Sequence, residues 1–160
     1  MRGVIGIIIL VLSLAVYAMT LVETEEPQWI VSGSQVLEMD SLEWEPLAGM
    51  VVEIEDGGPL WVNFQTHYRR SVAEGAGAEF VFFVDGVEIE ESFVRSTMVR
   101  AGSAEYVNMS YVVDVGQLDE EVAVHEIAVY WRKTLSNDVG ILQTSKSRQL
   151  SVVPLQVGRP

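Results

Sequence analysis

Apolar and polar residues alternate along much of the chain after residue 28. The stretch 60–68 is the clearest case, because Val62 and Phe64 fall on one side of an extended chain and Asn63 and Gln65 on the other. A period of two residues indicates a β-strand with one buried face. A first strand is expected to begin at Trp29. Further strands are expected over residues 51–55, 79–84, 87–91, 93–100, 106–115, 122–132, 141–144 and 150–153.

Residues 79–84 and 87–91 carry the strongest local signal. They are two strand-like runs joined by Asp85 and Gly86. This dipeptide favours a type I′ turn, in which both central residues have positive φ, so the two runs predict a β-hairpin. The first run is also apolar on both faces, which predicts that Phe83 is covered by another layer or another subunit.

The alternation also predicts which side chains form the core. The expected core residues are Val62, Phe64, Phe80, Phe82, Met109, Tyr111, Ile127, Val129, Trp131, Leu150 and Val152. Val36 and Leu42 are expected to point inward as well. Three large aromatic residues, Trp44, Trp61 and Tyr130, are expected outside the core.

About eight or nine short strands, with turn residues between them and no amphipathic helix, predict an all-β fold. The expected architecture is an antiparallel β-sandwich, jelly-roll-like, preceded by one N-terminal transmembrane or signal helix. The expected division is an anchor or signal in residues 1–22, an acidic spacer in 23–28 and one sandwich domain in 29–156.

The anchor or signal is the uncharged run from Val4 to Val22. A transmembrane helix needs about 20 apolar residues, so the run is long enough to be retained as an anchor in a lipid bilayer. Arg2 before it, and the small-residue pattern at 16–18, also suit a signal peptide cleaved before Met19. In both cases the positive-inside rule places the following domain outside the cytoplasm, membrane-anchored in the first case and secreted in the second.

Four segments of the β region resemble a family of surface proteins. They are residues 58–64, with a Gly-Pro turn before a strand; 82–89, with the Asp-Gly hairpin; 125–132, reading His-Glu-Ile-Ala-Val-Tyr-Trp-Arg; and 148–155, reading Arg-Gln-Leu-Ser-Val-Val-Pro-Leu. Over residues 57–155 the chain resembles jelly-roll domains of the complement-globular-head and tumour-necrosis-factor type in phage tail fibres and virion surface proteins. The family usually has a glycine where Ala123 and Val124 stand. The resemblance implies a structural or binding protein that assembles as a trimer.

The N-terminal segment has a resemblance of its own. Arg2 and Gly3, followed by the apolar run, resemble the start of archaeal flagellins and pilins, whose helix packs into a filament core. The leader is shorter than in those families, and the glutamate of bacterial pilins is absent. This resemblance implies an alternative function as a pilin-like or flagellar-accessory filament subunit.

Charge and composition exclude several kinds of site. The net charge is −13, which opposes binding to nucleic acid phosphates. The chain contains no cysteine, so it has neither disulfides nor thiolate metal ligands. His125 and Glu126 begin like a zinc-protease motif, but that motif needs a helix and a second histidine, and position 129 is Val.

The remaining candidate site residues are few. His67 and His125 could share a metal only if they met across strands. Three acidic clusters could bind calcium, although alternate glutamates are also what the solvent face of a strand presents. These are Glu53/Glu55/Asp56, Glu88/Glu90/Glu91 and Asp119/Glu120/Glu121. Neither a metal nor a cofactor is therefore expected. Asn108, followed by Met109 and Ser110, is a glycosylation acceptor expected on the exposed face of its strand.

With no convergent acid–base pair and no nucleotide-binding motif, we expect no enzymatic activity. The expected function is that of a membrane-tethered, extracytoplasmic structural or adhesive protein, a virion or cell-surface component that forms homo-oligomers or binds other surface or virion proteins. A secreted hydrolase or a carbohydrate-binding module is a remote alternative.

Overall fold

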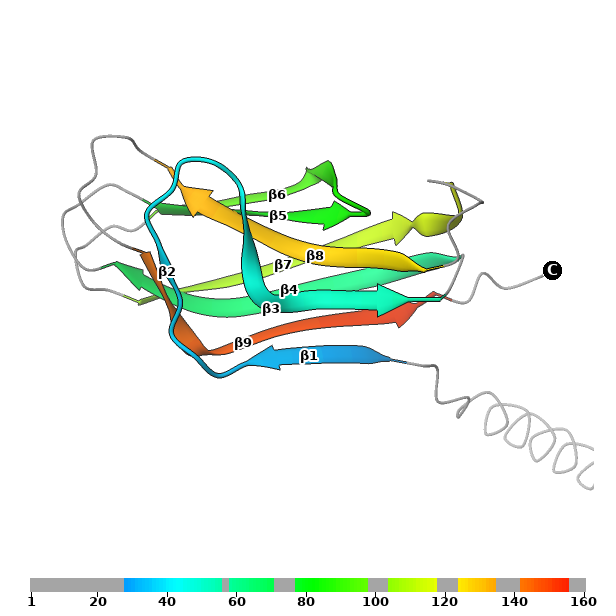
Figure 1. Ribbon diagram of the computed structural model, residues 1–160, viewed down its shortest axis with the longest axis horizontal. Helices are drawn as coiled ribbons and strands as arrows, with labels where there is room; N and C mark the ends of the chain where they lie inside the picture. The colour runs from blue at the N-terminus through cyan, green and yellow to red at the C-terminus, as the bar shows by residue number, and fades with distance from the viewer. Residues whose placement is uncertain are drawn as a thin grey trace, which may run out of the picture.

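The chain forms two antiparallel β-sheets that pack face to face (Figure 1). The computed structural model describes residues 28–55, 58–70, 77–97, 104–117, 124–134 and 142–155. Its strands are β1 (Trp29–Gly33), β2 (Glu38–Met39), β3 (Glu45–Ile54), β4 (Pro59–Arg70), β5 (Gly77–Val84), β6 (Val87–Thr97), β7 (Ala104–Asp114), β8 (His125–Lys133) and β9 (Leu142–Pro154). A short 3₁₀ turn, Val115–Gln117, follows β7.

The strands pair in a nested order. β5 pairs with β6, β4 with β7, β3 with β8 and β1 with β9, so that each pair encloses the previous one along the chain. One sheet, called sheet A below, has the order β1-β9-β4-β7, with β2 also paired to β9; the other, sheet B, has the order β3-β8-β5-β6. A nested antiparallel ribbon rolled into two sheets is the jelly-roll arrangement. The all-β sandwich expected from the sequence is therefore confirmed.

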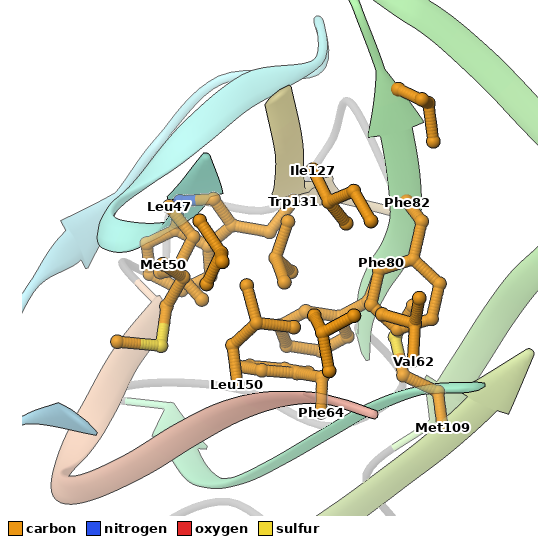
Figure 2. Close-up of a cluster of buried hydrophobic side chains, with 14 of the residues drawn as sticks. Leu47, Met50, Val62, Phe64, Phe80, Phe82, Met109, Ile127, Trp131 and Leu150 are labelled. Atoms are coloured by element: carbon orange, nitrogen blue, oxygen red, sulfur yellow. The ribbon is translucent and has the colours of Figure 1, made fainter. Parts of the chain in front are cut away.

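The core lies between the sheets (Figure 2). Val62, Phe64, Met109 and Leu150 reach it from sheet A, and side chains such as Phe82 reach it from sheet B. All the core residues expected from the alternation are buried except Tyr111, which is half-buried and packs against the others. Period-two alternation predicted the core well because each of these strands has one face toward the other sheet.

The hairpin expected at Asp85 and Gly86 is present between β5 and β6. Both residues have positive φ, 52° and 77°, as a type I′ turn requires. The Asp85 carboxylate also fixes the turn to β8. One oxygen accepts from the Glu126 amide at 2.8 Å, and the other lies 2.7 Å from His125 Nδ1. The turn therefore joins three strands of sheet B.

Two expected strand boundaries are wrong because β-bulges were read as strand ends. Residues 87–97 form one continuous strand, β6. Its pairing with β5 contains a bulge: Phe80 pairs with Val94 and Phe82 with Ile89, so several residues of β6 lie opposite the single residue Val81. At this bulge the Ser92 hydroxyl accepts from the Phe82 amide at 2.8 Å and donates to the Ile89 carbonyl at 2.7 Å. Residues 142–154 are likewise one strand, with a register shift against β4 between Thr66 and Tyr68.

The inward orientation expected for Val36 and Leu42 is also wrong. Each is 42% exposed, whereas Met39 is buried and Leu37 packs against the core. Only Glu38 and Met39 form a strand in this region, so no long sheet face fixes the alternation there. The direction of each side chain instead follows the pairing of β2 with β9.

Residues 1–27, which include the proposed anchor or signal and most of the spacer, lie outside the described residues. Within the described ranges, no helix is long and apolar enough to cross a membrane. Trp29 starts β1 at the end of the sandwich where β9 finishes, because it pairs with Val152 (Figure 1).

Candidate functional site

The two histidines do not meet. His67 is exposed on β4 in sheet A, whereas His125 is buried on β8 in sheet B and pairs with Asp85. Of the acidic clusters, Glu53 and Glu55 are exposed at the end of β3, and Glu90 lies exposed on β6. Among the described residues, no group of three or more histidine, aspartate or glutamate side chains could hold a metal ion. Asp56 and residues 119–121 lie outside those residues.

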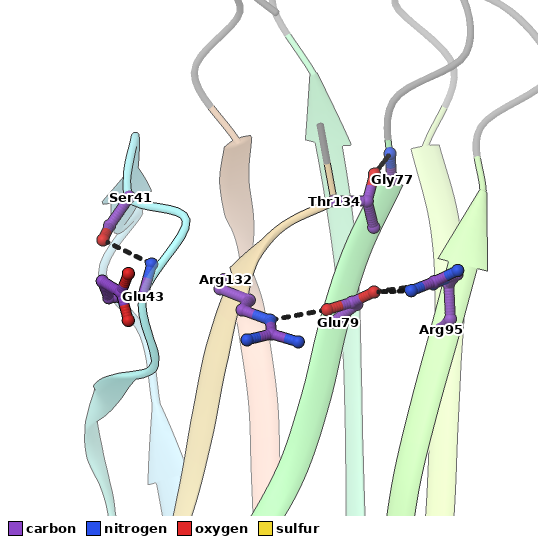
Figure 3. Close-up of polar contacts among 7 residues, drawn as sticks. All are labelled: Ser41, Glu43, Gly77, Glu79, Arg95, Arg132 and Thr134. Carbon is purple, nitrogen blue, oxygen red and sulfur yellow. Dashed lines mark hydrogen bonds and ion pairs between the residues drawn. The ribbon is translucent and has the colours of Figure 1, made fainter. Parts of the chain in front are cut away.

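The outer face of sheet B carries a buried carboxylate between two arginines (Figure 3). Glu79 on β5 is 2% exposed, and its two oxygens accept from Arg132 Nε on β8 and Arg95 Nε on β6, each at 2.6 Å. The three side chains come from adjacent strands, so this ion triad spans the sheet at right angles to the strands. A buried charge requires such pairing, because leaving it alone costs several kcal/mol.

Aromatic rings surround this triad. The Arg132 guanidinium carbon lies 4.1 Å from the centre of the Trp44 ring, and Trp44 meets Phe93 edge to face at 6.2 Å. Further along β5, Phe83 stacks on Tyr130 at 3.9 Å and is half-buried. The outer apolar positions of β5 are thus covered in part within the chain.

The outer face of sheet A is different, because neutral polar side chains cover it. Asn63 on β4 donates through Nδ2 to Asn108 Oδ1 at 2.9 Å and to Ser110 Oγ at 2.7 Å on β7. Asn108 is exposed, as expected from the alternation with the buried Met109. The glycosylation acceptor thus stands on an accessible strand face, and its modification stays a prediction.

A second amide network crosses the same face. Gln65 on β4 donates through Nε2 to Gln149 Oε1 on β9 at 2.7 Å, and Tyr106 on β7 donates its hydroxyl proton to Gln65 Oε1 at 2.8 Å. The His67 ring lies 4.9 Å from the Tyr106 ring. Three strands therefore contribute to one fixed arrangement of amide, phenol and imidazole groups.

A hollow of about 490 Å³ opens over this network. Its walls come from the end of β1 and from β4, β7 and β9, and the groups facing it include those of Ser32, Gln65, His67, Tyr106, Ser147 and Gln149. It lies where the register of β9 against β4 shifts, next to Thr66. A register shift interrupts the flat surface of a sheet and leaves room for a ligand.

Arg148 lies beneath this hollow and faces inward. Its guanidinium donates to the Gln35 and Ala48 carbonyl oxygens, and burial lowers the pKa of the group below its ordinary value. Gly33 passes so close that an added Cβ would lie 2.3 Å from the guanidinium carbon. Arg148 thus ties β9 to β3 and to the segment that follows β1.

Apart from the glycosylation acceptor Asn108 and the metal candidate His67, sequence reasoning identified no site on sheet A. It placed Gln65 and His67 on a polar strand face but gave Tyr106 and Gln149 no role, because these residues come from strands that are distant in sequence. The spacing of 41 residues between Gln65 and Tyr106, and of 84 between Gln65 and Gln149, carries no local signal. The register of β4 with both neighbours brings them together.

No protein-family model and no curated protein matches the chain. Solved structures do match it. A chain in the structure of the infectious bursal disease virus Gt strain aligns with a TM-score of 0.57 at 10% identity, covering 82% of this chain and 34% of the viral one. A chain of the Gx strain aligns with a TM-score of 0.54 at 11% identity, covering 85% and 35%. The chain therefore spans about a third of the viral chains and is similar to them in fold, a two-sheet β-sandwich.

Proposed function

We propose that the chain is a structural subunit of a virion or cell surface, held at a membrane by residues 4–22 and assembled through its sandwich. The observation that carries this proposal is the nested two-sheet roll, which is shared with chains of a virus over more than four-fifths of the sequence. We further propose that the sandwich is of the complement-globular-head type expected from the sequence and that it assembles as a trimer.

The tether is supported by the order of segments. The uncharged run ends at Val22, and β1 begins at Trp29, so a short acidic spacer separates the run from the sandwich. A retained helix would place the domain just outside the membrane, where it would present its sheets as a structural or adhesive surface. It would also raise the local concentration of the domains.

Membrane fractionation tests this tether. The full chain, expressed in a bacterial host, is expected to stay with the membrane pellet after alkaline carbonate washing. Its sandwich should be open to protease added outside spheroplasts. N-terminal sequencing should find no chain that starts at Met19. A soluble product starting at Met19 would show that residues 4–22 are a cleaved signal and would remove the tether.

Assembly is supported by the free strand edges. β3 is interrupted by a register shift after Pro46, and β6 bears a bulge and several glutamates. Both features discourage pairing with another chain. β7 carries neither: it pairs residue by residue with β4 from Asp114 back to Ala104, and in the described part of the chain it pairs with no other strand. β1, the other edge strand of sheet A, is only five residues long, and a short edge strand also offers little to pair with. We therefore assign the contact between copies to the β7 edge.

The outer side chains of β7 suit such a contact. Val112 is 51% exposed, and Asn108 and Ser110 on the same face of the strand are exposed and uncharged. The chain has a net charge of −13, so two copies repel each other over most of their surfaces. The repulsion is weakest where an uncharged, partly apolar strand face such as this one meets its copy.

A further inference from the structure

The hollow on the outer face of sheet A has a chemistry unlike that of the rest of the surface. The chain contains 23 aspartate and glutamate residues. None of the side chains that the structure describes in this lining carries a carboxylate. Arg148, the arginine among the described lining residues, directs its guanidinium to backbone carbonyls below the surface. The described groups that face the hollow are hydroxyls, amides and an imidazole.

The amide and phenol groups are held in place before any ligand arrives. Gln65 is fixed on both sides, since its amide nitrogen donates to Gln149 and its oxygen accepts from Tyr106. Because Gln149 Oε1 is the acceptor, the Gln149 amide nitrogen presents N–H donors. The Tyr106 oxygen, having donated its proton, presents lone pairs as an acceptor. Donors and acceptors therefore stand side by side on a rigid sheet.

Ring faces stand beside the polar groups. Tyr106 is 52% exposed, and its ring lies against that of His67, which is also exposed. A flat ring offers an apolar surface with a polar tip, so it can cover the C–H face of a ligand while the amides bind its hydroxyls. The volume of about 490 Å³ lies within the roughly 300–1,000 Å³ typical of ligand pockets.

A ligand that suits this arrangement must be uncharged, rich in hydroxyls that both donate and accept, and partly apolar on its ring faces. Among the described lining residues, an anion would find no lysine and no outward-facing arginine to offset the strongly negative charge of the chain, and a cation would find no carboxylate. We propose that this hollow binds a neutral saccharide, with Tyr106 as the ring platform and Gln65 and Gln149 as the amides that bind its hydroxyls. The site is built within one copy, so it does not depend on the proposed assembly.

A glycan array followed by saturation-transfer NMR tests this proposal. The full chain is made in a bacterial host, so that Asn108 carries no glycan, and is held in a zwitterionic detergent, because alkyl glycoside detergents would compete for the site. The array carries several hundred neutral glycans together with sialylated ones. A neutral glycan that binds on the array is then titrated as a free oligosaccharide. Binding of neutral glycans is expected, with weaker or no binding of their sialylated forms.

Two variants and one matched control locate the site. Tyr106→Ala and Gln149→Ala are each expected to weaken binding at least tenfold. Val112→Ala, an equally exposed position further along the same strand as Tyr106, should change it less than twofold. Thermal unfolding of each variant shows whether the fold is retained, and the bulkier Tyr106→Leu and Gln149→Glu replace any variant that unfolds. The proposal is overturned if no neutral glycan binds, if only sialylated glycans bind, or if folded variants at Tyr106 and Gln149 bind as the wild type does.

Discussion

The side chain of Phe82 lies between the two sheets, fully buried, and close to side chains from both. Removing its ring in Phe82→Ala leaves a cavity that rigid strands cannot close, so we expect a loss of about 3–5 kcal/mol in the free energy of unfolding. Denaturant titration of the full chain, followed by tryptophan fluorescence, measures it. Glu90→Ala, an exposed position on the neighbouring strand, is the control and should stay within about ±0.5 kcal/mol. Equal effects would contradict the placement of Phe82.

Tyr68 gives a prediction about alkaline pH. Burial raises the pKa of its phenol above the ordinary value of 10.0. The phenol also donates its proton to the Ser96 carbonyl at 2.9 Å, a bond that is lost when the group ionises. The folded chain therefore keeps this proton to higher pH than the unfolded chain. The stability linked to it is fully present below pH 10 and is lost as the pH rises through the folded-state pKa.

Thermal unfolding of the full chain across this alkaline range tests the point. Tyr68→Phe removes the titrating group, so its melting temperature should fall less steeply above pH 10 than that of the wild type. Parallel curves for the wild type and Tyr68→Phe would show that the buried phenol does not control alkaline stability.

At the scale of strands, the alternation in residues 60–68 and the Asp85–Gly86 turn were sufficient to predict β4 and the β5–β6 hairpin. Such signals are local, since each residue's direction follows from its neighbours in the chain. The bulges were not predictable in this way. At the β6 bulge the side chains no longer alternate between the two faces. The Ser92 hydroxyl replaces a missing backbone partner for the Phe82 amide, and this bond exists only when β5 lies beside β6.

The networks on the outer faces were still less predictable. Glu79 could be placed on a strand, but its burial depends on Arg95 and Arg132, which arrive from the two flanking strands. The same holds for Gln65 and its partners across sheet A. These contacts depend on which strands pair and in which register, and neither can be determined from a single sequence.

The edge of β7 gives the prediction at this scale. Lysine on an edge strand opposes pairing with another chain, so Val112→Lys should reduce the fraction of assembled protein at micromolar concentration. Ile30→Lys is the matched control, because Ile30 is similarly exposed, lies on β1 at the other edge of sheet A, and gives the same change in net charge. Sedimentation velocity of the full chain in detergent measures both. An equal loss of assembly in the two variants would contradict the assignment to β7.

For the whole molecule, the sandwich offers separate surfaces for separate roles. Sheet B has an outer face braced by the Glu79 ion triad and by aromatic rings, whereas sheet A has a neutral outer face with a hollow at one end and the β7 edge at its side. A tether at the start of β1 would hold all of these outside the membrane. This division suits a surface subunit that both assembles and presents a binding face.

The mass of the assembled chain tests the central claim most directly. Native mass spectrometry of the full chain, released from detergent micelles at micromolar concentration, should give a discrete species near three times 17.8 kDa. A different discrete multiple would keep the assembly and replace the threefold symmetry. A single copy at every concentration, with the N-terminal segment present, would contradict the account of this protein as an assembling structural subunit.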